Sequence, residues 1–326
     1  MGPTSDPVGE YLATLERLRA RKRWSTDMAT VRFAALALGA GRTEADVERL
    51  EEAAATLRAR AGWTSPLRSE VRHVVAAMLV RERLDPGGVH DRVMETRTAL
   101  RSHRLPRSQA GTTFAALVLV LRSGGGPVPE RQLERLATIW RRWRSEHFWL
   151  TGADDLPAAA LHACGEREME MLVADVERAY ARLREAGFRR GNGLQWASHV
   201  LAVDPRGVDT GVERFRRVAE RLRRARVRVR PGRYDETAIL ALMYADVAAV
   251  VDRALDYRDR LRAVKPRAGR DLAFTVAVGL AFAADEGGPA DRVAGDLAAL
   301  QSIQAILSAR RAAAASAAGA GGAAHS

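Results

Sequence analysis

The sequence predicts an all-α protein made of about seven stacked helix hairpins, each about 40 residues long. Three observations lead to this prediction: a composition suited to helices, a helix ending that recurs at a regular interval, and an alternation of apolar with charged segments. Hydrophobic residues make up 47% of the 326 residues, which is enough for a substantial core, whereas aromatic residues make up only 6%. Alanine and leucine dominate the apolar set, and both favour helices over strands.

The recurring helix ending is a large apolar residue followed by arginine. Residues 18–21 and 57–60 have the same sequence, LRAR, and shorter versions follow at intervals of 39 to 43 residues. The apolar residues of these endings are Leu18, Leu57, Leu100, Trp143, Leu183, Leu222 and Leu261. Such an interval is typical of stacked helical repeats, in which each unit buries its apolar face against its neighbours.

Each interval contains two helices of different character. A strongly apolar segment comes first, as at residues 33–38, and a charged amphipathic segment follows, as at residues 44–60. In the segment 211–226, apolar side chains recur at helical spacing and arginines occupy the other faces. The apolar segments predict inner helices and the charged segments outer helices, with the glycines at 124–126 in a turn between two of them. These pairs would form a superhelical solenoid, or a closed α/α ring if the rotation from one hairpin to the next brings the last hairpin back to the first.

The hairpins are predicted to form one domain. No linker rich in proline, glycine or serine interrupts residues 7–307, so they are assigned to a single helical-repeat domain. Residues 1–6 are predicted to be a disordered N-terminus. Residues 308–326, which are rich in alanine and glycine, are predicted to be a disordered tail.

The high arginine content has two interpretations. The formal net charge is +12, from 52 basic and 40 acidic residues, and the only lysines are Lys22 and Lys265. Arginine in place of lysine, with abundant alanine and glycine, is typical of a GC-rich coding bias, so the charge alone does not predict a nucleic-acid partner. The alternative is nucleic-acid binding through arginine-rich outer helices, such as the segment 221–233 with its seven arginines.

The number of cysteines and the length of the apolar stretches indicate the cellular compartment. Cys164 is the only cysteine, which excludes an internal disulfide bond and suits a reducing environment. The first residues lack the charged and apolar pattern of a signal peptide, and no apolar stretch approaches the ~20 residues that a membrane-spanning helix needs. We therefore expect a cytoplasmic protein without a membrane partner.

One group of polar residues falls on two neighbouring inner helices. It consists of Asp154, Asp155 and His162 on the fourth inner helix and Asn192, Gln195 and His199 on the fifth. Asp155 and His162 are seven residues apart, as are Asn192 and His199, and seven residues make two helical turns. The two sets are offset by 37 residues, so they occupy equivalent places in consecutive hairpins. The spacing predicts a shared ligand-binding pocket.

Two other interpretations of this group stay open. Aspartate and asparagine at helix starts commonly cap free backbone N–H groups, and a histidine on an apolar helix is commonly a hydrogen-bonded core residue. Ser69 and Glu70, at the start of another inner helix, are interpreted as plain caps. The sequence contains no P-loop, no G-x-S-x-G, no H-E-x-x-H and no paired-cysteine metal site, and Cys164 is interpreted as a buried small hydrophobe. No catalytic residue, metal ligand or cofactor is assigned.

Two motifs in this region carry a family resemblance. Residues 151–155 are TGADD, and residues 187–199 are GFRRGNGLQWASH. They resemble the patterns TG-x-DD and GF-x-x-GN-x-LQ-x-x-SH of a bacterial all-helical family that is catalogued only as a domain of unknown function, and the likeness extends over most of residues 7–307. The resemblance implies a helical bacterial protein, and it implies no activity, cofactor or catalytic residue.

The leading functional hypothesis is a non-enzymatic binding or scaffold module that holds a peptide, a protein or a small ligand. It rests on a repeat architecture without catalytic motifs. The two alternatives are an enzyme with a polar pocket between the fourth and fifth inner helices, and a nucleic-acid binder that uses its arginine-rich outer helices.

Overall fold

The computed structural model describes residues 6–21, 27–146 and 151–285. In these ranges the chain forms fourteen α-helices, joined by loops and short 3₁₀ turns, and contains no strand. The prediction of an all-α fold is confirmed. The predicted disordered segments, 1–6 and 308–326, lie outside the described residues except for Asp6.

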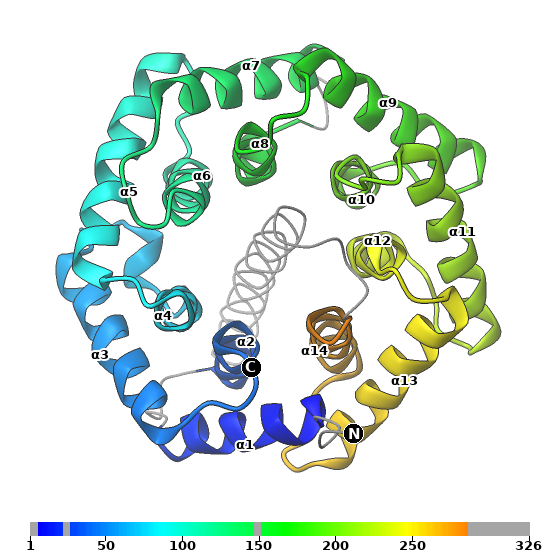
Figure 1. Ribbon diagram of the computed structural model, residues 1–326, viewed down its shortest axis with the longest axis horizontal. Helices are drawn as coiled ribbons and strands as arrows, with labels where there is room; N and C mark the ends of the chain where they lie inside the picture. The colour runs from blue at the N-terminus through cyan, green and yellow to red at the C-terminus, as the bar shows by residue number, and fades with distance from the viewer. Residues whose placement is uncertain (1–5, 22–26, 147–150, 286–326) are drawn as a thin grey trace, which may run out of the picture. The chain divides into compact units, whose positions relative to one another are not determined.

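The helices fall into two compact units, and the first contains α1 to α6. Figure 1 shows α1, α3 and α5 in one layer of this unit and α2, α4 and α6 in the other. Helix α2 packs against α1 and α4, α3 packs against α4 and α5, and α5 packs against α6. The bounds are α1 Pro7–Ala20, α2 Met28–Leu38, α3 Glu44–Arg60, η1 Pro66–Arg68, α4 Val71–Glu82, α5 Pro86–Leu100, η2 Arg101–His103 and α6 Gln109–Arg122.

The second unit contains α7 to α14 and has the same two-layered arrangement. Within it, α7, α9, α11 and α13 form one layer, and α8, α10, α12 and α14 form the other (Figure 1). Helix α10 packs against α9 and α12, and α12 packs against α11. The bounds are α7 Glu130–Glu146, η3 Ala153–Asp155, α8 Leu156–Ala163, α9 Met169–Glu185, α10 Asn192–Leu201, α11 Val208–Arg224, η4 Pro231–Arg233, α12 Tyr234–Leu242, α13 Val247–Ala263 and α14 Arg270–Ala283.

The two layers of each unit differ in burial, and we call them the apolar layer (even-numbered helices) and the amphipathic layer (odd-numbered helices). All nine residues of α12 are buried. In α11, a stripe of apolar side chains from Val208 to Leu222 is buried and arginines are exposed on the other faces. A helix that is apolar on all sides must be covered by neighbours, whereas one apolar stripe needs a single packing surface. The division into apolar and amphipathic helices therefore follows from the sequence pattern.

Arginines connect the helices of each unit in two ways. In the amphipathic layers, Arg60 pairs with Asp91 at 2.7 Å and Arg221 pairs with Asp252 at 2.6 Å. Elsewhere, arginines donate to carbonyl groups at the C-terminal ends of apolar-layer helices. Arg81 Nη1 donates to the Ala37 carbonyl at the end of α2, at 3.1 Å. The last carbonyls of a helix lack intrahelical partners and carry partial negative charge, so guanidinium groups stabilise them.

Two adjacent acidic residues are buried at the start of α12. Asp235 and Glu236 are 7% and 6% exposed, and Thr275 Oγ1 of α14 donates to Glu236 Oε1 at 2.7 Å. Burial, and next the neighbouring Asp235, raise the pKa of Glu236 well above its ordinary value of 4.5. Glu236 therefore keeps its proton in the folded protein at pH values where the unfolded chain has lost it.

We expect Glu236→Gln to remove part of the pH dependence of stability. Folding takes up a proton at Glu236, so the free energy of unfolding falls by up to ~1.4 kcal/mol per pH unit as the pH rises from 4.5 towards the raised pKa. Glutamine keeps the acceptor for Thr275 and cannot ionise. In urea denaturation between about pH 5 and 8, the free energy of unfolding of the variant should increase relative to that of wild type as the pH rises. A difference in unfolding free energy between variant and wild type that does not change with pH would contradict this prediction. The control is Glu213→Gln, at an exposed position.

Candidate functional site

The polar residues predicted on the fourth and fifth inner helices meet around the ring of Trp143. Trp143 lies on α7, His162 on α8 and His199 on α10. The Trp143 ring centroid is 5.5 Å from that of His162 and 3.9 Å from that of His199, and the two imidazole centroids are 6.2 Å apart. All three side chains are buried. Two helices of the apolar layer thus place their histidines on one indole.

Hydrogen bonds connect this cluster to the segment before α8. Thr151 Oγ1 donates to the Trp143 carbonyl at 3.1 Å and accepts from Gln195 Nε2 at 3.1 Å. Asp155 Oδ2 accepts from a backbone N–H three residues earlier, at 2.8 Å, and its Oδ1 lies 4.0 Å from His199 Nε2. Asp155 therefore binds local backbone, as in the capping interpretation, and also faces His199.

Burial shifts the pKa of two groups in the cluster. It raises the pKa of Asp155 to about 6, a rise that a backbone N–H opposes and the neighbouring Asp154 increases. Burial also lowers the pKa of His162 to about 3, although a hydrogen bond to the backbone of His199 acts in the opposite direction. At neutral pH the His162 imidazole is therefore neutral, as an enclosed position requires.

Four of the six predicted site residues come together, and two do not. Asp154 and Asn192 are exposed and lie outside the cluster. The structure adds Thr151 and Trp143, which the seven-residue spacing does not select. Thr151 opens the TGADD motif, and Trp143 belongs to a recurring helix ending. The cluster is enclosed in the core, because His162, His199 and Gln195 are at most 5% exposed. In the described ranges, Trp143 Nε1 and Gln195 Oε1 have no hydrogen-bond partner. A ligand at these residues stays a prediction.

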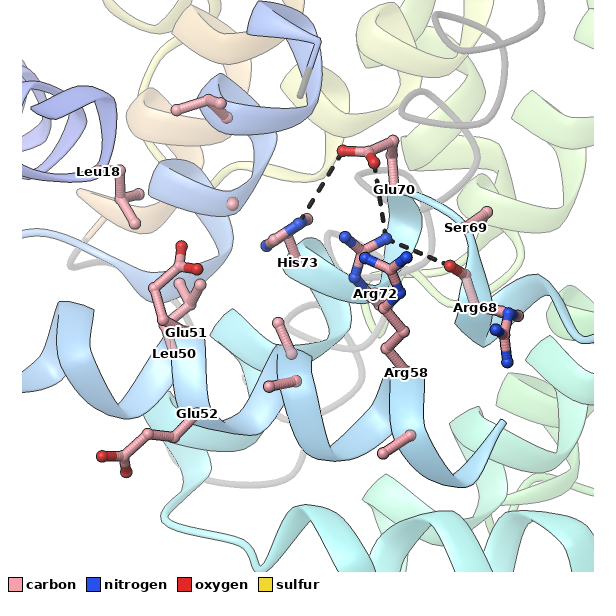
Figure 2. A pocket seen from close by; sticks show the side chains of 15 residues that line it. Leu18, Leu50, Glu51, Glu52, Arg58, Arg68, Ser69, Glu70, Arg72 and His73 are labelled. Carbon is pink, nitrogen blue, oxygen red and sulfur yellow. Dashed lines mark hydrogen bonds and ion pairs between the residues drawn. The ribbon is translucent and has the colours of Figure 1, made fainter. Parts of the chain in front are cut away.

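The first unit contains a cleft that involves α1, α2, α3 and α4. Its volume is about 1060 Å³, and Figure 2 shows the side chains that line it. One wall is apolar and includes Leu18, Val31, Ala34, Leu50 and Ala54. The polar lining residues are Glu51, Glu52, Arg58, Arg68, Ser69, Glu70, Arg72 and His73. Apolar walls with a few polar groups are typical of sites for small organic molecules.

The charged side chains are separated along this cleft. Figure 2 shows Arg58, Arg68 and Arg72 near Glu70 at one end. It shows Glu51 and Glu52 at the other end. Arg72 Nη1 lies 3.5 Å from Glu70 Oε1. Arg68 donates to a backbone carbonyl at 3.3 Å, with its guanidinium carbon 5.2 Å from the centre of the Trp63 ring. Within the described parts of the chain, neither Arg58 nor Arg68 forms an ion pair. This end, which we call the basic end, therefore carries excess positive charge.

A histidine lies beside Glu70 at the basic end. His73 Nε2 is 3.9 Å from Glu70 Oε2 (Figure 2). Burial, and next the positive charge of Arg72, lower the pKa of His73 to about 4. At neutral pH, Glu70 therefore faces an uncharged imidazole.

The cleft was not predicted from the sequence. The sequence predicts a plain cap at Glu70, but its side chain makes no capping hydrogen bond at the start of α4. The available signal was a glutamate, an arginine and a histidine within one turn, followed by an apolar run from Val74 to Val80. That signal does not identify the helices that face these side chains, so it does not predict a cavity.

No group of three or more histidine, cysteine, aspartate or glutamate residues in the described ranges is arranged to hold a metal ion. In the same parts of the chain, every helix is too short or too polar to cross a membrane.

Comparison with known proteins identifies the family. No curated protein and no solved structure matches the chain. A family model described as "Protein of unknown function (DUF4003)" matches residues 14–312, which is most of the chain. The resemblance to a helical family of unknown function, drawn from residues 151–155 and 187–199, is confirmed at the level of the family. The chain belongs to this family, the proteins of unknown function DUF4003.

Proposed function

We propose that the protein is a binding protein that holds an amphipathic anion in the cleft of its first unit. The observation that carries the proposal is the combination of an apolar wall with a basic end where Arg58 and Arg68 have no carboxylate partner in the described ranges. A ligand carboxylate or phosphate would form charge-assisted hydrogen bonds with these guanidinium groups. The apolar part of the ligand would pack against Leu18, Val31 and Leu50.

This proposal is the small-ligand form of the non-enzymatic binding hypothesis. The enzyme alternative has less support, because His162 and His199 pack against an indole and are almost fully buried. The nucleic-acid alternative also has less support, because arginines such as Arg60, Arg81 and Arg221 already bind acidic side chains or helix carbonyls. A surface for phosphate groups needs arginines that are free to contact them.

We also propose that the helix pairs are copies of a repeat of about 40 residues. The recurring endings at intervals of 39 to 43 residues support this. So do the ion pairs Arg60–Asp91 and Arg221–Asp252, because each joins consecutive helices of an amphipathic layer, and both aspartates lie nine residues before the apolar residue of a recurring ending. Equivalent positions of repeated units are expected to make similar contacts.

We expect Arg58→Ala to weaken the binding of an amphipathic anion such as decanoate by about tenfold or more, because a hydrogen bond to a charged group contributes ~1.5–3 kcal/mol. Isothermal titration calorimetry with decanoate measures the affinity, and native mass spectrometry of freshly purified protein identifies bound anions directly. The matched control is Arg142→Ala on α7, which is exposed and without an ion pair in the described ranges.

Two results would contradict the proposal. The first is that neither decanoate nor decyl phosphate binds the wild-type protein and that no anion co-purifies with it. The second is an equal loss of affinity in Arg58→Ala and Arg142→Ala, which would assign binding to overall charge and not to the cleft.

A further inference from the structure

The pair Glu70 and His73 has hydrogen-bonding capacity that the described protein residues do not use. Glu70 Oε2 and His73 Nε2 are buried atoms, and neither has a hydrogen-bond partner among the described residues. Their separation of 3.9 Å is too long for a direct hydrogen bond. Buried polar atoms in native proteins are generally paired with protein, water or ligand. Both side chains lie on the cleft, at the basic end (Figure 2).

The spacing of the two atoms fits a single bridging oxygen. An oxygen placed between them can lie about 2.8 Å from each, which is an ordinary hydrogen-bond length. A hydroxyl group has one donor and two acceptor sites, so it can donate to the Glu70 carboxylate and accept from a neutral imidazole N–H. One hydroxyl therefore satisfies both atoms.

The charges around the pair favour a hydroxyl over an ammonium group. Arg72 already lies 3.5 Å from the Glu70 carboxylate, and Arg58 and Arg68 line the same end of the cleft. A cationic group would enter a region of excess positive charge, and like charges repel. A neutral hydroxyl meets no such repulsion and can stand beside an anionic group held by the arginines.

We propose that Glu70 and His73 select a hydroxyl group next to the anionic group, so that the ligand class is a hydroxylated amphipathic acid, such as a 3-hydroxy fatty acid. This inference rests on the proposed function of the cleft. The arginines at the basic end would hold the carboxylate, Glu70 and His73 would bind the hydroxyl, and the apolar wall would bind the chain. A site built to bind a hydroxyl discriminates strongly against the analogue that lacks it, because its own polar atoms are then unpaired.

The test compares 3-hydroxydecanoate with decanoate by isothermal titration calorimetry. Wild type should bind the hydroxylated acid about tenfold more tightly or better. Glu70→Leu and His73→Phe should each reduce this preference to about twofold or less, while their affinity for decanoate stays equal or rises. The matched control is Glu52→Gln, on the same cleft and without an ion pair in the described ranges, which should keep the full preference.

The outcomes separate the two proposals. Equal wild-type affinities for the two acids would overturn the hydroxyl inference and leave the proposed function standing. Preserved discrimination in both Glu70→Leu and His73→Phe would also overturn the inference. Absence of binding for both acids would also overturn the hydroxyl inference, and if decyl phosphate does not bind and no anion co-purifies either, the proposed function itself is overturned. The comparison of the two acids on wild-type protein tests the hydroxyl inference even if a variant does not fold. Circular dichroism identifies a variant that does not fold.

Discussion

Replacing Arg206 with methionine is expected to lower the free energy of unfolding by about 3–5 kcal/mol, the cost of leaving a buried charge without its partner. Arg206 Nε and Nη2 bind the two carboxylate oxygens of Asp204, each at 2.9 Å. The same guanidinium donates to the carbonyls of Ala241, Leu242 and Met243 at 3.0, 3.1 and 3.3 Å. Asp204 is only 1% exposed, so water cannot replace the lost partner.

Urea denaturation of the variant measures this effect. The control is Arg216→Met, because Arg216 pairs with Glu213 at the surface, where both side chains are more than half exposed. Such a pair contributes at most about 1 kcal/mol. Adding Asp204→Asn to Arg206→Met should recover part of the stability, because the double variant has no unpaired carboxylate. If Arg206→Met costs no more than Arg216→Met, the buried pair does not stabilise the second unit.

Gly193→Ala is expected to destabilise the protein by about 1–3 kcal/mol through overpacking. Alanine normally stabilises a helix by about 0.8–1.0 kcal/mol relative to glycine, so the expected sign is the reverse of the helix propensity. The reason is the contact between α10 and η4. A Cβ atom on Gly193 would lie 2.1 Å from the carbonyl oxygen of Pro231, and real Cβ contacts stay above 3.0 Å. The backbone of α10 fixes the position of this Cβ atom, and the oxygen belongs to the backbone of η4, so no side-chain rotation relieves the contact.

The control for this variant lies on the other side of the same contact. A Cβ atom on Gly232 meets no atom within 4 Å, so Gly232→Ala should change the melting temperature little. Thermal unfolding of the two variants side by side separates the steric effect from the general effect of replacing glycine. Equal melting temperatures for the two would show that η4 moves away from α10 at little cost.

Helix positions were largely predictable because they depend on local patterns. The charged segment predicted at residues 44–60 is α3, with the same bounds. The segment predicted at 211–226 begins three residues earlier in α11, because Val208 extends the buried stripe. The glycines at 124–126 lie in the predicted turn between α6 and α7. Periodicity of apolar side chains determines which face of a helix is buried, and this information is present within each segment.

Contacts between helices were less predictable, because sequence spacing does not identify which helices face each other. The seven-residue spacing correctly placed His162 and His199 in one cluster, but it also included Asn192, which is exposed. The two residues share one face of α10, but Asn192 is the first residue of that helix, so its burial depends on how far the neighbouring helices α9 and α12 cover the start of α10. The cleft was missed for the same reason. The position of Glu70 and His73 beside an apolar wall depends on how α1 to α4 pack.

The arginine contacts at the C-terminal ends of helices also bear on which residues can be exchanged there. Arg206 and Arg214 each donate to several carbonyls around the end of α12. The N–H donors of each planar guanidinium point in fixed directions relative to one another. A lysine ammonium is a compact point charge and cannot reproduce this multidentate geometry. Exchange of either arginine for lysine should therefore leave carbonyls at the end of α12 without a donor.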